Sequence, residues 1–326
     1  MGCPGGIGPE IILKYFSNIS RPPEVRSVVI GDIGILEKCG RDLGLPAPCI
    51  PWQPGQSYPE SGIPVLSVSS LDLADHSWGH FTQKSSKCMA DYILTAVKLA
   101  KNNIIDGITT CPISKSALQL AGHKFPGHTE MLVELTGAQN YTMMMAGDSL
   151  KVTLTTIHCA LSQVPAKLTE SAIYNLIHIT NNALKTDFGI NSPNIAVAGL
   201  NPHSSEDGLF GTEEENVITP AIHRAIHDGV NASGPYPPDT VFFKASSGLY
   251  DAVVCMYHDQ GLIPFKLLHF KDGVNVTLGL PIVRTSVDHG TAYDIAGKGL
   301  ADETSLSCAV AMASDICKNR ITHNSK

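Results

Sequence analysis

The chain has 326 residues, of which 43% are hydrophobic and 16% are charged, a composition typical of a globular protein with an ample core. The formal net charge of -7 gives no basic patch of the kind that nucleic-acid binding needs, so a local cluster of positive groups must hold any anionic ligand. No apolar run approaches the roughly 18 residues of a membrane span, and no signal peptide is visible. Nine cysteines without a CxxC spacing argue against a disulfide framework, and we expect a cytoplasmic protein.

Short apolar runs alternate with helical patterns along the chain, which predicts an α/β fold with mainly parallel strands. The glycine-rich residues 5–10 run into a helix, whereas the proline-rich residues 46–64 indicate an irregular connection. The clearest helix covers residues 85–103, where apolar side chains recur at helical spacing. Strands are predicted at residues 26–31, 104–110, 152–157, 194–200, 252–256 and 274–278. Further helices are predicted at residues 35–43, 115–120, 167–183, 213–228 and 300–319.

Three histidines follow apolar, strand-like runs: His158 ends VTLTTIH, His203 ends NIAVAGLNPH and His258 ends DAVVCMYH. In open α/β sheets the carboxyl ends of the strands form the edge where ligands bind. Three neutral imidazoles at that edge would suit a divalent metal, with positions left for substrate oxygens. Their wide separation carries no chelate signature, so surface or hydrogen-bonded core histidines stay open as the alternative.

Two aspartates lie near these histidines in the sequence. Asp259 follows His258 directly, and Asp239 lies in GPYPPDT before the apolar run TVFF. A carboxylate beside a metal-binding imidazole can orient the ring, bind the metal or relay a proton. Asp239 also fits a turn former after two prolines.

Lys266, Asn275 and Arg284 form a second set of candidate ligand groups. A bidentate arginine with a lysine is the usual means of binding a phosphate or a carboxylate. Read singly, Lys266 at the end of IPFK and Arg284 after GLPIV also fit solvated charges at strand ends. His128 and Thr129 add an imidazole and a hydroxyl in a loop before a helix, where N-terminal amides favour anions.

A dinucleotide-binding G-x-G-x-x-G is absent, because residues 5–10 lack the third glycine. The sequence DHGTAYDIAGKG at residues 288–299 is dense in glycine, histidine and aspartate before a helix. This second segment therefore indicates a nucleotide-cradling loop.

Five short motifs together resemble the 4-hydroxythreonine-4-phosphate dehydrogenase family. They are GIGPE (6–10), FPGHTE (125–130), NPH (201–203), YHDQG (257–261) and RTSVDHGTA (284–292). The resemblance extends from residue 1 to about 315 and implies two α/β/α domains of the isocitrate/isopropylmalate dehydrogenase type with an interdomain cleft. By analogy, the cofactor-side domain takes residues 1–122 and 290–326, and the metal, substrate and dimerisation domain takes residues 123–289.

The resemblance implies an NAD-dependent oxidation of 4-phosphohydroxy-L-threonine to 2-amino-3-oxo-4-phosphonooxybutanoate. That product loses carbon dioxide to give 3-amino-2-oxopropyl phosphate, in pyridoxal 5'-phosphate biosynthesis. NADP stays open as a second cofactor. The resemblance also implies a homodimer with its active site at the subunit contact, and a divalent metal for which zinc is the first choice and magnesium, cobalt, manganese and nickel stay open.

Carried over position by position, His158, His203 and His258 match the metal ligands of the family, one of which reaches across from the partner subunit. The positions that match substrate-binding residues are His128, Thr129, Lys266, Asn275 and Arg284. The positions that match the cofactor loop are His289, Gly290, Thr291, Asp294 and Gly297. The motifs do not identify the proton acceptor, for which the candidates are Asp239, Asp259 and Lys266.

The sequence departs from the family pattern at three places. Cys3 stands where the family has an acidic residue, and no strand precedes it; Ser204 and Ser205 follow the NPH motif where the family prefers Ala-Gly. The motif TTIH, which ends at His158, has one residue more than the usual Thr-Thr-His. Sister dehydrogenases acting on 4-phospho-D-erythronate, 4-phosphothreonate or a terephthalate dihydrodiol are the first alternative. A homologue that binds metal or nucleotide without turnover is the alternative from another class.

Overall fold

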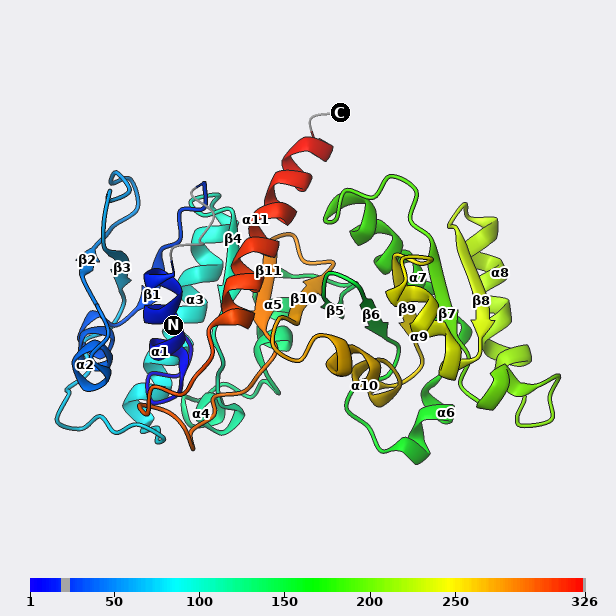
Figure 1. Ribbon diagram of the computed structural model, residues 1–326, viewed down its shortest axis with the longest axis horizontal. Helices are drawn as coiled ribbons and strands as arrows, with labels where there is room; N and C mark the ends of the chain where they lie inside the picture. The colour runs from blue at the N-terminus through cyan, green and yellow to red at the C-terminus, as the bar shows by residue number, and fades with distance from the viewer. Residues whose placement is uncertain (19–23, 325–326) are drawn as a thin grey trace. The chain divides into compact units, whose positions relative to one another are not determined.

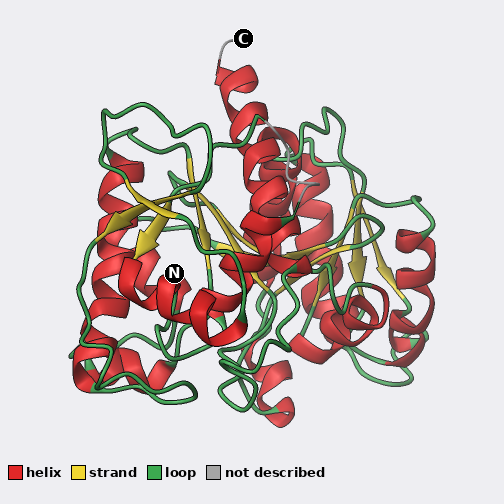
Figure 2. Cartoon of the chain, turned by 60° about the vertical axis from the view of Figure 1, so that its left-hand side comes forward, coloured by secondary structure: helices red, strands yellow, loops and turns green. Residues whose placement is uncertain are grey.

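The computed structural model describes residues 1–18 and 24–324, which divide into two compact units. Unit 1 comprises Met1–Ala138 and Pro281–Ser314, and unit 2 comprises Gln139–Leu280 and Asp315–Lys326. Figures 1 and 2 show that helices and strands alternate in both, so the predicted α/β class is confirmed. No helix in these described ranges is long and apolar enough to cross a membrane.

Unit 1 contains a three-stranded parallel sheet in the order β1-β3-β2, and it also contains β4 and β11, which are parallel neighbours. These strands are β1 (Val29–Gly31), β2 (Cys49–Pro51), β3 (Ile63–Ser67), β4 (Gly107–Thr110) and β11 (Val283–Val287). The helices are α1 (Gly8–Ser17), α2 (Ile33–Leu43), α3 (Gln83–Lys101), α4 (Lys115–Leu120) and α5 (His128–Thr136). The helix α11 (Thr304–Asn324) begins in unit 1 and ends in unit 2.

The helix α3 begins where its sequence provides a cap. The Thr82 side chain accepts a hydrogen bond from the Ser85 amide, and the Ser85 hydroxyl accepts one from the Thr82 amide. This reciprocal pair satisfies two backbone donors that the first turn leaves open. The buried face of α3 follows the helical spacing that predicted it, with Met89, Ile93 and Val97 in the core.

The predicted irregular connection at residues 46–64 is wrong in part, because it contains β2 and the beginning of β3. β2 is an edge strand of its sheet, and its one pairing partner in the described ranges is β3. An edge strand tolerates proline because one of its sides makes no ladder hydrogen bonds. The prolines therefore argued against a strand here, although a short edge strand such as β2 can contain proline.

Unit 2 contains strands in the order β10-β5-β6-β9-β7-β8. β6, β9, β7 and β8 are parallel, whereas β5 is antiparallel to both β6 and β10. The strands are β5 (Thr142–Ala146), β6 (Lys151–Leu154), β7 (Ile195–Ala198), β8 (Ala232–Tyr236), β9 (Ala252–Cys255) and β10 (Val274–Leu278). The helices are α6 (Val164–Lys167), α7 (Glu170–Thr186), α8 (Thr219–His227), α9 (Pro238–Ser246) and α10 (His258–Leu268). Three short helical segments are η1 (Leu161–Gln163), η2 (Pro202–Ser205) and the π-helix η3 (Glu214–Ile218).

α7 and α10 cover opposite faces of this sheet. The Thr153 hydroxyl of β6 lies 3.0 Å from the Thr180 hydroxyl of α7. The neighbouring Leu154 points to the other face, because a Cβ added at Gly261 of α10 would lie 2.8 Å from its Cδ2 atom. Successive residues of a strand face opposite sides, so a side chain larger than hydrogen at Gly261 would push α10 away from β6.

The division into units differs from the predicted domains at three places. Residues 123–138 lie in unit 1 because α5 packs against α3, and residues 281–289 lie there because β11 pairs with β4. Asp315–Lys326 lies in unit 2, where the Arg320 guanidinium donates hydrogen bonds to both carboxylate oxygens of Asp187 at 2.7 and 2.9 Å. Contacts distant in sequence decide these boundaries, and composition alone does not reveal them.

Two local predictions in unit 2 are also wrong. Asp239 does not lie in a turn but in the first turn of α9, where a carboxylate interacts favourably with the helix dipole. His258 does not end a strand: β9 ends at Cys255, and His258 is the first residue of α10. The predicted helix at 213–228 consists of the π-helix η3 followed by α8.

Candidate functional site

The carboxyl ends of three neighbouring parallel strands in unit 2 lead to the three predicted metal ligands. β6, β9 and β7 lie side by side in the sheet. His158 follows β6, His258 follows β9, and His203 follows β7 in the segment η2. The expectation that these histidines emerge at one edge of the sheet therefore agrees with the strand order.

His158 and His258 are neighbours, with ring centroids 5.9 Å apart. The Nδ1 atom of His258 lies 2.6 Å from a carboxylate oxygen of Asp259. A carboxylate on one ring nitrogen fixes the tautomer and the ring orientation, which leaves Nε2 as the nitrogen that a metal would use. This contact is compatible with the ring-orienting role, one of those that the sequence allows for Asp259.

His203 has the same kind of partner. Its Nδ1 atom lies 3.0 Å from a carboxylate oxygen of Glu206, and this hydrogen bond raises the pKa of His203. The Asp239 carboxylate of α9 also raises the pKa of His203, but more weakly. The His203 side chain is 63% exposed. Among the described residues no group of three or more His, Cys, Asp or Glu is placed to hold a metal ion, so one chain brings together His158 and His258 but not all three ligands.

The backbone around His203 adopts an uncommon conformation. Residues 203–207 all have positive φ, between 47° and 77°, although none of them is glycine. Such a conformation costs on the order of 1–2 kcal/mol for each L-residue. Ser205 offsets part of the cost, because its hydroxyl donates to the Gly211 carbonyl at 2.7 Å and accepts from the Gly208 amide at 2.9 Å. Strain of this kind is found mainly where a side chain must be held for function.

The remaining predicted residues of unit 2 lie on two elements. Lys266 is half-buried in α10, with its Nζ atom 5.8 Å from the centroid of the Phe270 ring. Asn275 lies in β10 opposite Met145, and its Nδ2 atom donates to the Met143 sulfur at 3.0 Å. The Asn275 Oδ1 atom is buried and has no hydrogen-bond partner in the described ranges. An acceptor in this state is available to a ligand.

Unit 1 brings together Arg284, His128 and Thr129. Arg284 lies inside β11 and is 3% exposed, so the prediction that it follows a strand is wrong, as is the alternative of a solvated charge. Its Nη2 atom donates to the Thr110 hydroxyl at 2.8 Å. Burial lowers the pKa of Arg284 to about 10, and the Glu130 carboxylate opposes that shift. Arg284 consequently remains a cation at neutral pH in a protected position, as an anion-binding group requires.

His128 is the first residue of α5, and Thr129 is the second. Burial, and then the positive charge of Arg284, hold the pKa of His128 well below the usual 6.5. The imidazole is therefore neutral at physiological pH. It can donate or accept a hydrogen bond without adding charge beside Arg284.

The shifted pKa of His128 predicts a pH-dependent stability. Below pH 6.5 His128 binds a proton in the unfolded state but not in the folded state. The free energy of unfolding therefore decreases as the pH falls. The loss can reach about 1.4 kcal/mol per pH unit until His128 itself titrates. Urea unfolding of the wild type and of His128→Gln between about pH 7 and 5 measures it. We expect the wild type to lose more stability than the variant; two parallel curves would contradict the assignment.

The predicted cofactor loop at residues 288–299 packs against the start of the chain. The Ile7 amide donates to the Thr291 carbonyl at 3.1 Å, and the Ala301 amide donates to the buried Glu10 carboxylate at 2.8 Å. Lys14 binds the same carboxylate at 3.0 Å. The motifs GIGPE (6–10) and RTSVDHGTA (284–292) are far apart in the sequence but are therefore in contact in the fold.

Further contacts make the cofactor loop close-packed. Gly297 has a φ of 72°, and an added Cβ would lie 2.3 Å from the Trp78 ring. Cys3, at the departure from the family pattern, is fully buried with its sulfur 3.1 Å from the Tyr293 hydroxyl. Burial raises the pKa of the Cys3 thiol, so it is neutral where the family has a carboxylate.

Three of the remaining loop residues have identifiable surroundings. The Nδ1 atom of His289 lies 3.1 Å from the Gly290 carbonyl, and its buried Nε2 atom has no hydrogen-bond partner within the described part of the chain. Gly290 has open space where a Cβ would stand. Asp294 is exposed.

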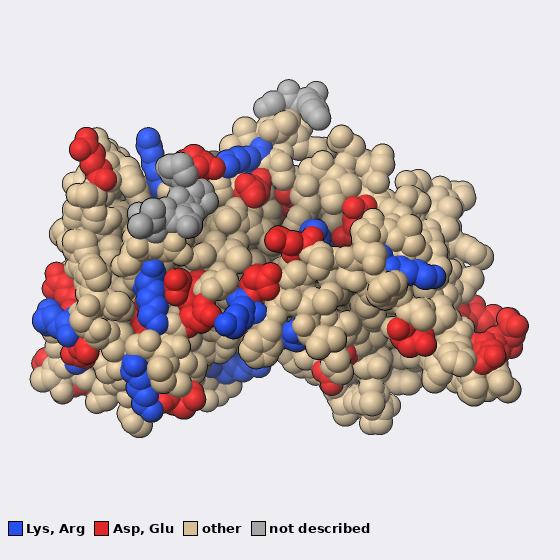
Figure 3. Space-filling view, viewed as in Figure 1, with Lys and Arg blue, Asp and Glu red and all other residues tan. Residues whose placement is uncertain are grey.

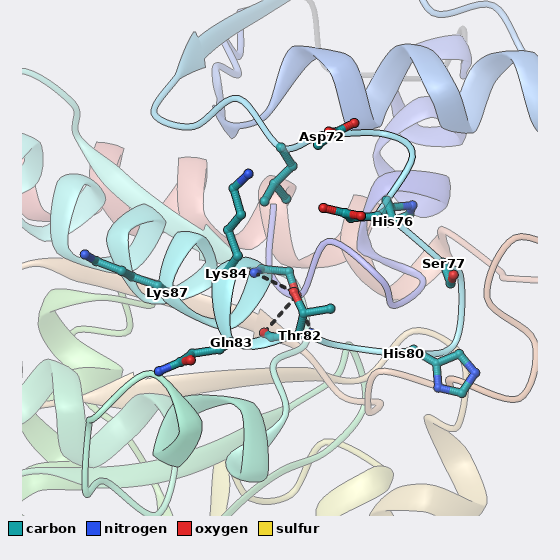
Figure 4. Close-up of a pocket in the computed structure, with 11 residues that line it drawn as sticks. Asp72, His76, Ser77, His80, Thr82, Gln83, Lys84 and Lys87 are labelled. Carbon is teal, nitrogen blue, oxygen red and sulfur yellow. Dashed lines mark hydrogen bonds between the residues drawn. The ribbon is translucent and has the colours of Figure 1, made fainter.

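A cavity of about 660 Å³ in unit 1 lies beside this loop and is lined by residues 71–87 (Figure 4). His76 and His80 line it, together with Lys84, Lys87 and the cap of α3. The His76 Nε2 atom lies 3.1 Å from the Pro4 carbonyl, which joins the wall of the cavity to the start of the chain. None of the predicted site residues lines this cavity.

Charges of both signs mix on the face that Figure 3 shows, with Lys and Arg beside Asp and Glu. A phosphate would thus find its positive partners in local groups such as Arg284 rather than in a broad basic surface.

Sequence reasoning assigned no role to three buried polar residues next to the candidate site: Glu10, Glu214 and Gln260. Each is less than 7% exposed and makes hydrogen bonds to distant segments. Glu10 and Gln260 lie inside recognised motifs, which provided a signal, whereas Glu214 lies outside all of them. Their partners, however, become apparent only in the folded chain.

Comparisons with known proteins agree with the motif resemblance. A family model described as "Pyridoxal phosphate biosynthetic protein PdxA" matches residues 24–313. The chain is 52% identical over 321 residues to the 4-hydroxythreonine-4-phosphate dehydrogenase of Desulfosudis oleivorans, covering 97% of this chain and 94% of that relative. It is 42% identical over 325 residues to the D-threonate 4-phosphate dehydrogenase of Cupriavidus necator, covering 98% and 96%.

A solved structure is similar over the same length. The crystal structure of 4-hydroxythreonine-4-phosphate dehydrogenase from Klebsiella pneumoniae matches with a TM-score of 0.88 and 39% identity, covering 97% of this chain and 98% of that one. The fold and these relatives define an α/β oxidoreductase of the dehydrogenase type. The chain belongs to the family described as Pyridoxal phosphate biosynthetic protein PdxA, which confirms the resemblance drawn from the motifs.

Proposed function

We propose that this enzyme oxidises the hydroxyl group of 4-phosphohydroxy-L-threonine to give 2-amino-3-oxo-4-phosphonooxybutanoate. The product then loses carbon dioxide to give 3-amino-2-oxopropyl phosphate, in pyridoxal 5'-phosphate biosynthesis. The observation that carries the proposal is the pair of neighbouring imidazoles, His158 and His258, in a chain 52% identical to an enzyme of that name. NAD, with NADP open as a second choice, accepts the hydride when it is bound.

His158, His203 and His258 are the proposed ligands of a divalent metal, with zinc as the first choice. Such a metal, when bound, stabilises the negative charge that develops on the substrate oxygen. The donor chemistry supports this assignment, because carboxylates hold Nδ1 of both His203 and His258 and leave Nε2 as the ligating nitrogen. Reconstitution with zinc, cobalt, nickel, manganese and magnesium would distinguish the candidates that an imidazole site accepts.

Arg284 and Lys266 are the proposed phosphate ligands. Binding energy from the remote phosphate would position the reacting carbon without taking part in the chemistry. The buried, charged Arg284 supports this role, and the neutral His128 with the Thr129 hydroxyl would complete the hydrogen bonds to the anion. Asn275 would form a hydrogen bond with the substrate. Its buried Oδ1 atom, which has no hydrogen-bond partner in the described ranges, supports this role.

The cofactor would bind at His289, Gly290, Thr291, Asp294 and Gly297. The buried Nε2 atom of His289, with no partner in the described part of the chain, and the open space at Gly290 support a ligand at this loop. Asp239, Asp259 and Lys266 remain the candidate proton acceptors. Their positions differ: Asp259 is held on His258, Asp239 lies near His203, and Lys266 lies two turns along α10 from His258.

The enzyme is proposed to act as a homodimer, because the described residues of one chain do not join His203 to the other two proposed ligands. α10, which begins at His258, also displays an apolar surface to solvent: Ile263 is 67% exposed and Leu267 is 84% exposed, with Phe270 just beyond the helix at 77%. Exposed apolar residues in such proximity are typical of a subunit contact. A second copy of the chain would cover this surface and supply the missing ligand.

Leu267→Glu tests this arrangement. A charge on the apolar surface of α10 should dissociate the dimer. It should also abolish turnover, because each proposed metal site then loses the imidazole that the second copy supplies. Light scattering after size exclusion would give the mass, and NADH formation would give the activity. Ile226→Glu on α8, where Ile226 is 48% exposed, is the matched control and should leave both unchanged. A monomeric Leu267→Glu variant with full activity would refute the shared site.

The substrate is tested with a panel of purified compounds. NADH formation should be fastest with 4-phosphohydroxy-L-threonine and slower with 4-phosphothreonate and 4-phospho-D-erythronate. The second candidate function, oxidation of 4-phosphothreonate, is favoured by the 42% identical relative of that name. Faster turnover of 4-phosphothreonate would establish it in place of the first, and no turnover with any compound would favour a non-catalytic homologue.

A further inference from the structure

The ends of β6, β9 and β7 are joined by one chain of buried hydrogen bonds that the proposed reaction does not use directly. The Thr156 hydroxyl and amide both donate to the Met256 carbonyl, at 2.8 and 3.2 Å. The Met256 amide donates to Oε1 of Gln260 at 2.7 Å, and Nε2 of Gln260 donates to the Gly199 carbonyl at 2.6 Å. Thr156 and Gln260 are 7% and 6% exposed.

These bonds reach each segment that carries a proposed metal ligand. Thr156 lies two residues before His158, and Met256 lies two residues before His258. Gly199 begins the segment that leads from β7 to His203. Gln260 is thus the link between the end of β9 and the end of β7, because its amide oxygen accepts from one segment and its amide nitrogen donates to the other.

Glu214 extends the network toward His203. Its Oε1 atom accepts hydrogen bonds from the amides of Leu200 and Asn201, both at 2.7 Å, and its Oε2 atom accepts one from the Asn201 side chain at 2.9 Å. Glu214 is 4% exposed and is the first residue of the π-helix η3. Single π-helical turns are rare and are frequent at functional sites, so this one points to a constraint on where the Glu214 carboxylate lies.

The segment that this network holds is the strained one. Residues 203–207 keep positive φ values only if neighbouring contacts determine their conformation. Glu214 fixes the two residues before Pro202, and the Ser204 hydroxyl donates to the Pro235 carbonyl at 3.0 Å on the other side of His203. His203 is therefore held from both directions, and Gln260 ties its support to the segment of His258.

We propose that Gln260, assisted by Glu214 and Thr156, is a positioning residue that fixes where the segment of His203 lies on its own subunit. It thereby sets where that imidazole meets the His158 and His258 pair across the proposed dimer contact, and so tunes the affinity for the divalent metal. This inference rests on the proposed function, because it concerns the metal site proposed there. Residues behind metal-binding histidines change metal affinity by about 10–100-fold when they are replaced. Gln260 acts one step further back, through the backbone.

The test compares metal binding by the apo protein in three variants. Gln260→Met keeps the volume but removes both hydrogen bonds, and Thr156→Val is a milder change that removes one. Thr180→Val is the matched control, because it removes the buried hydroxyl contact between Thr180 and Thr153 on the other face of the same sheet. Cobalt binding, measured in competition with a chromophoric chelator, gives the affinity of each.

We expect Gln260→Met to weaken cobalt binding about tenfold or more, Thr156→Val to weaken it by roughly twofold to tenfold, and Thr180→Val to leave it unchanged. Hydrogen exchange of the Leu200 and Asn201 amides gives a readout that needs no metal, and it should quicken in Gln260→Met but not in Thr180→Val. If the wild type binds no cobalt, the proposed metal site is refuted. The exchange rates of the two amides still show whether Gln260 positions the segment that leads to His203. Wild-type affinity in both Gln260→Met and Thr156→Val, or unchanged exchange at both amides, would overturn the inference.

Discussion

Replacing His258 by alanine is expected to lower kcat/KM for 4-phosphohydroxy-L-threonine about a thousandfold. Loss of one imidazole would weaken the metal, which supplies several kcal/mol of charge stabilisation, and about 4 kcal/mol corresponds to a factor of 10³. The measurement is steady-state NADH formation at saturating NAD with zinc added. His258 begins α10 and is only half-buried, so the variant should fold normally.

The matched control for that prediction is His223→Ala. His223 is an exposed histidine of α8 in the same unit, and its loss should leave kcat/KM within twofold of the wild type. A His258→Ala enzyme that kept more than about a tenth of its activity would mean that the imidazole does not hold a catalytic metal.

Replacing Arg284 by lysine is expected to raise KM for the phosphorylated substrate by roughly 10-fold to 100-fold. A hydrogen bond to a charged group contributes about 1.5–3 kcal/mol, and lysine cannot reproduce the planar, bidentate geometry of the guanidinium. The effect should be absent with unphosphorylated 4-hydroxythreonine, whose turnover does not use the phosphate site. Comparing the two substrates in both enzymes isolates the contact between Arg284 and the phosphate.

The buried position of Arg284 requires a stability control. The residue is 3% exposed and bonded to Thr110, so part of any loss could come from the fold of unit 1. Urea unfolding of Arg284→Lys and of Arg224→Lys, an exposed arginine of α8, separates the two effects. Equal losses with phosphorylated and unphosphorylated substrate would assign Arg284 a structural role instead.

The sequence predicted those parts of the fold in which local pattern and final structure agree. The run before His258 is apolar because β9 is buried between β6 and β7, and the helical spacing of α3 reflects one buried face. The apolar run of β9 and the helical spacing of α3 can each be read from a short stretch of the sequence. The positions of the three histidines after strands follow from the same local patterns, which is why the edge of the sheet could be anticipated.

Local pattern was insufficient where distant contacts decide the structure. GLPIV reads as a strand that ends before Arg284, but only its last residue, Val283, lies in β11. Pairing of β11 with β4 places the arginine inside the strand, where it is buried. Two prolines before Asp239 suggest a turn, yet proline is also favoured in the first turn of a helix, which is where α9 places it. In both cases the local sequence allows two conformations, and a contact with a segment distant in the sequence selects one of them.

The buried polar network could not be read from the sequence at all. Gln260 lies inside a recognised motif, but its partners Met256 and Gly199 are defined by the neighbouring positions of β9 and β7. Glu214 likewise acquires its role only because η3 brings its carboxylate to the amides after β7. A motif indicates that such residues matter, whereas the hydrogen bonds indicate what each one does.

A metal held by His158, His203 and His258 is proposed to support oxidation of a phosphorylated hydroxy amino acid. The most direct test follows NADH formation by its absorbance with 4-phosphohydroxy-L-threonine and NAD, before chelation, after chelation and after zinc is returned. We predict turnover that disappears with the chelator and recovers with zinc. Turnover that continues at the same rate in the chelator would contradict the metal-assisted mechanism.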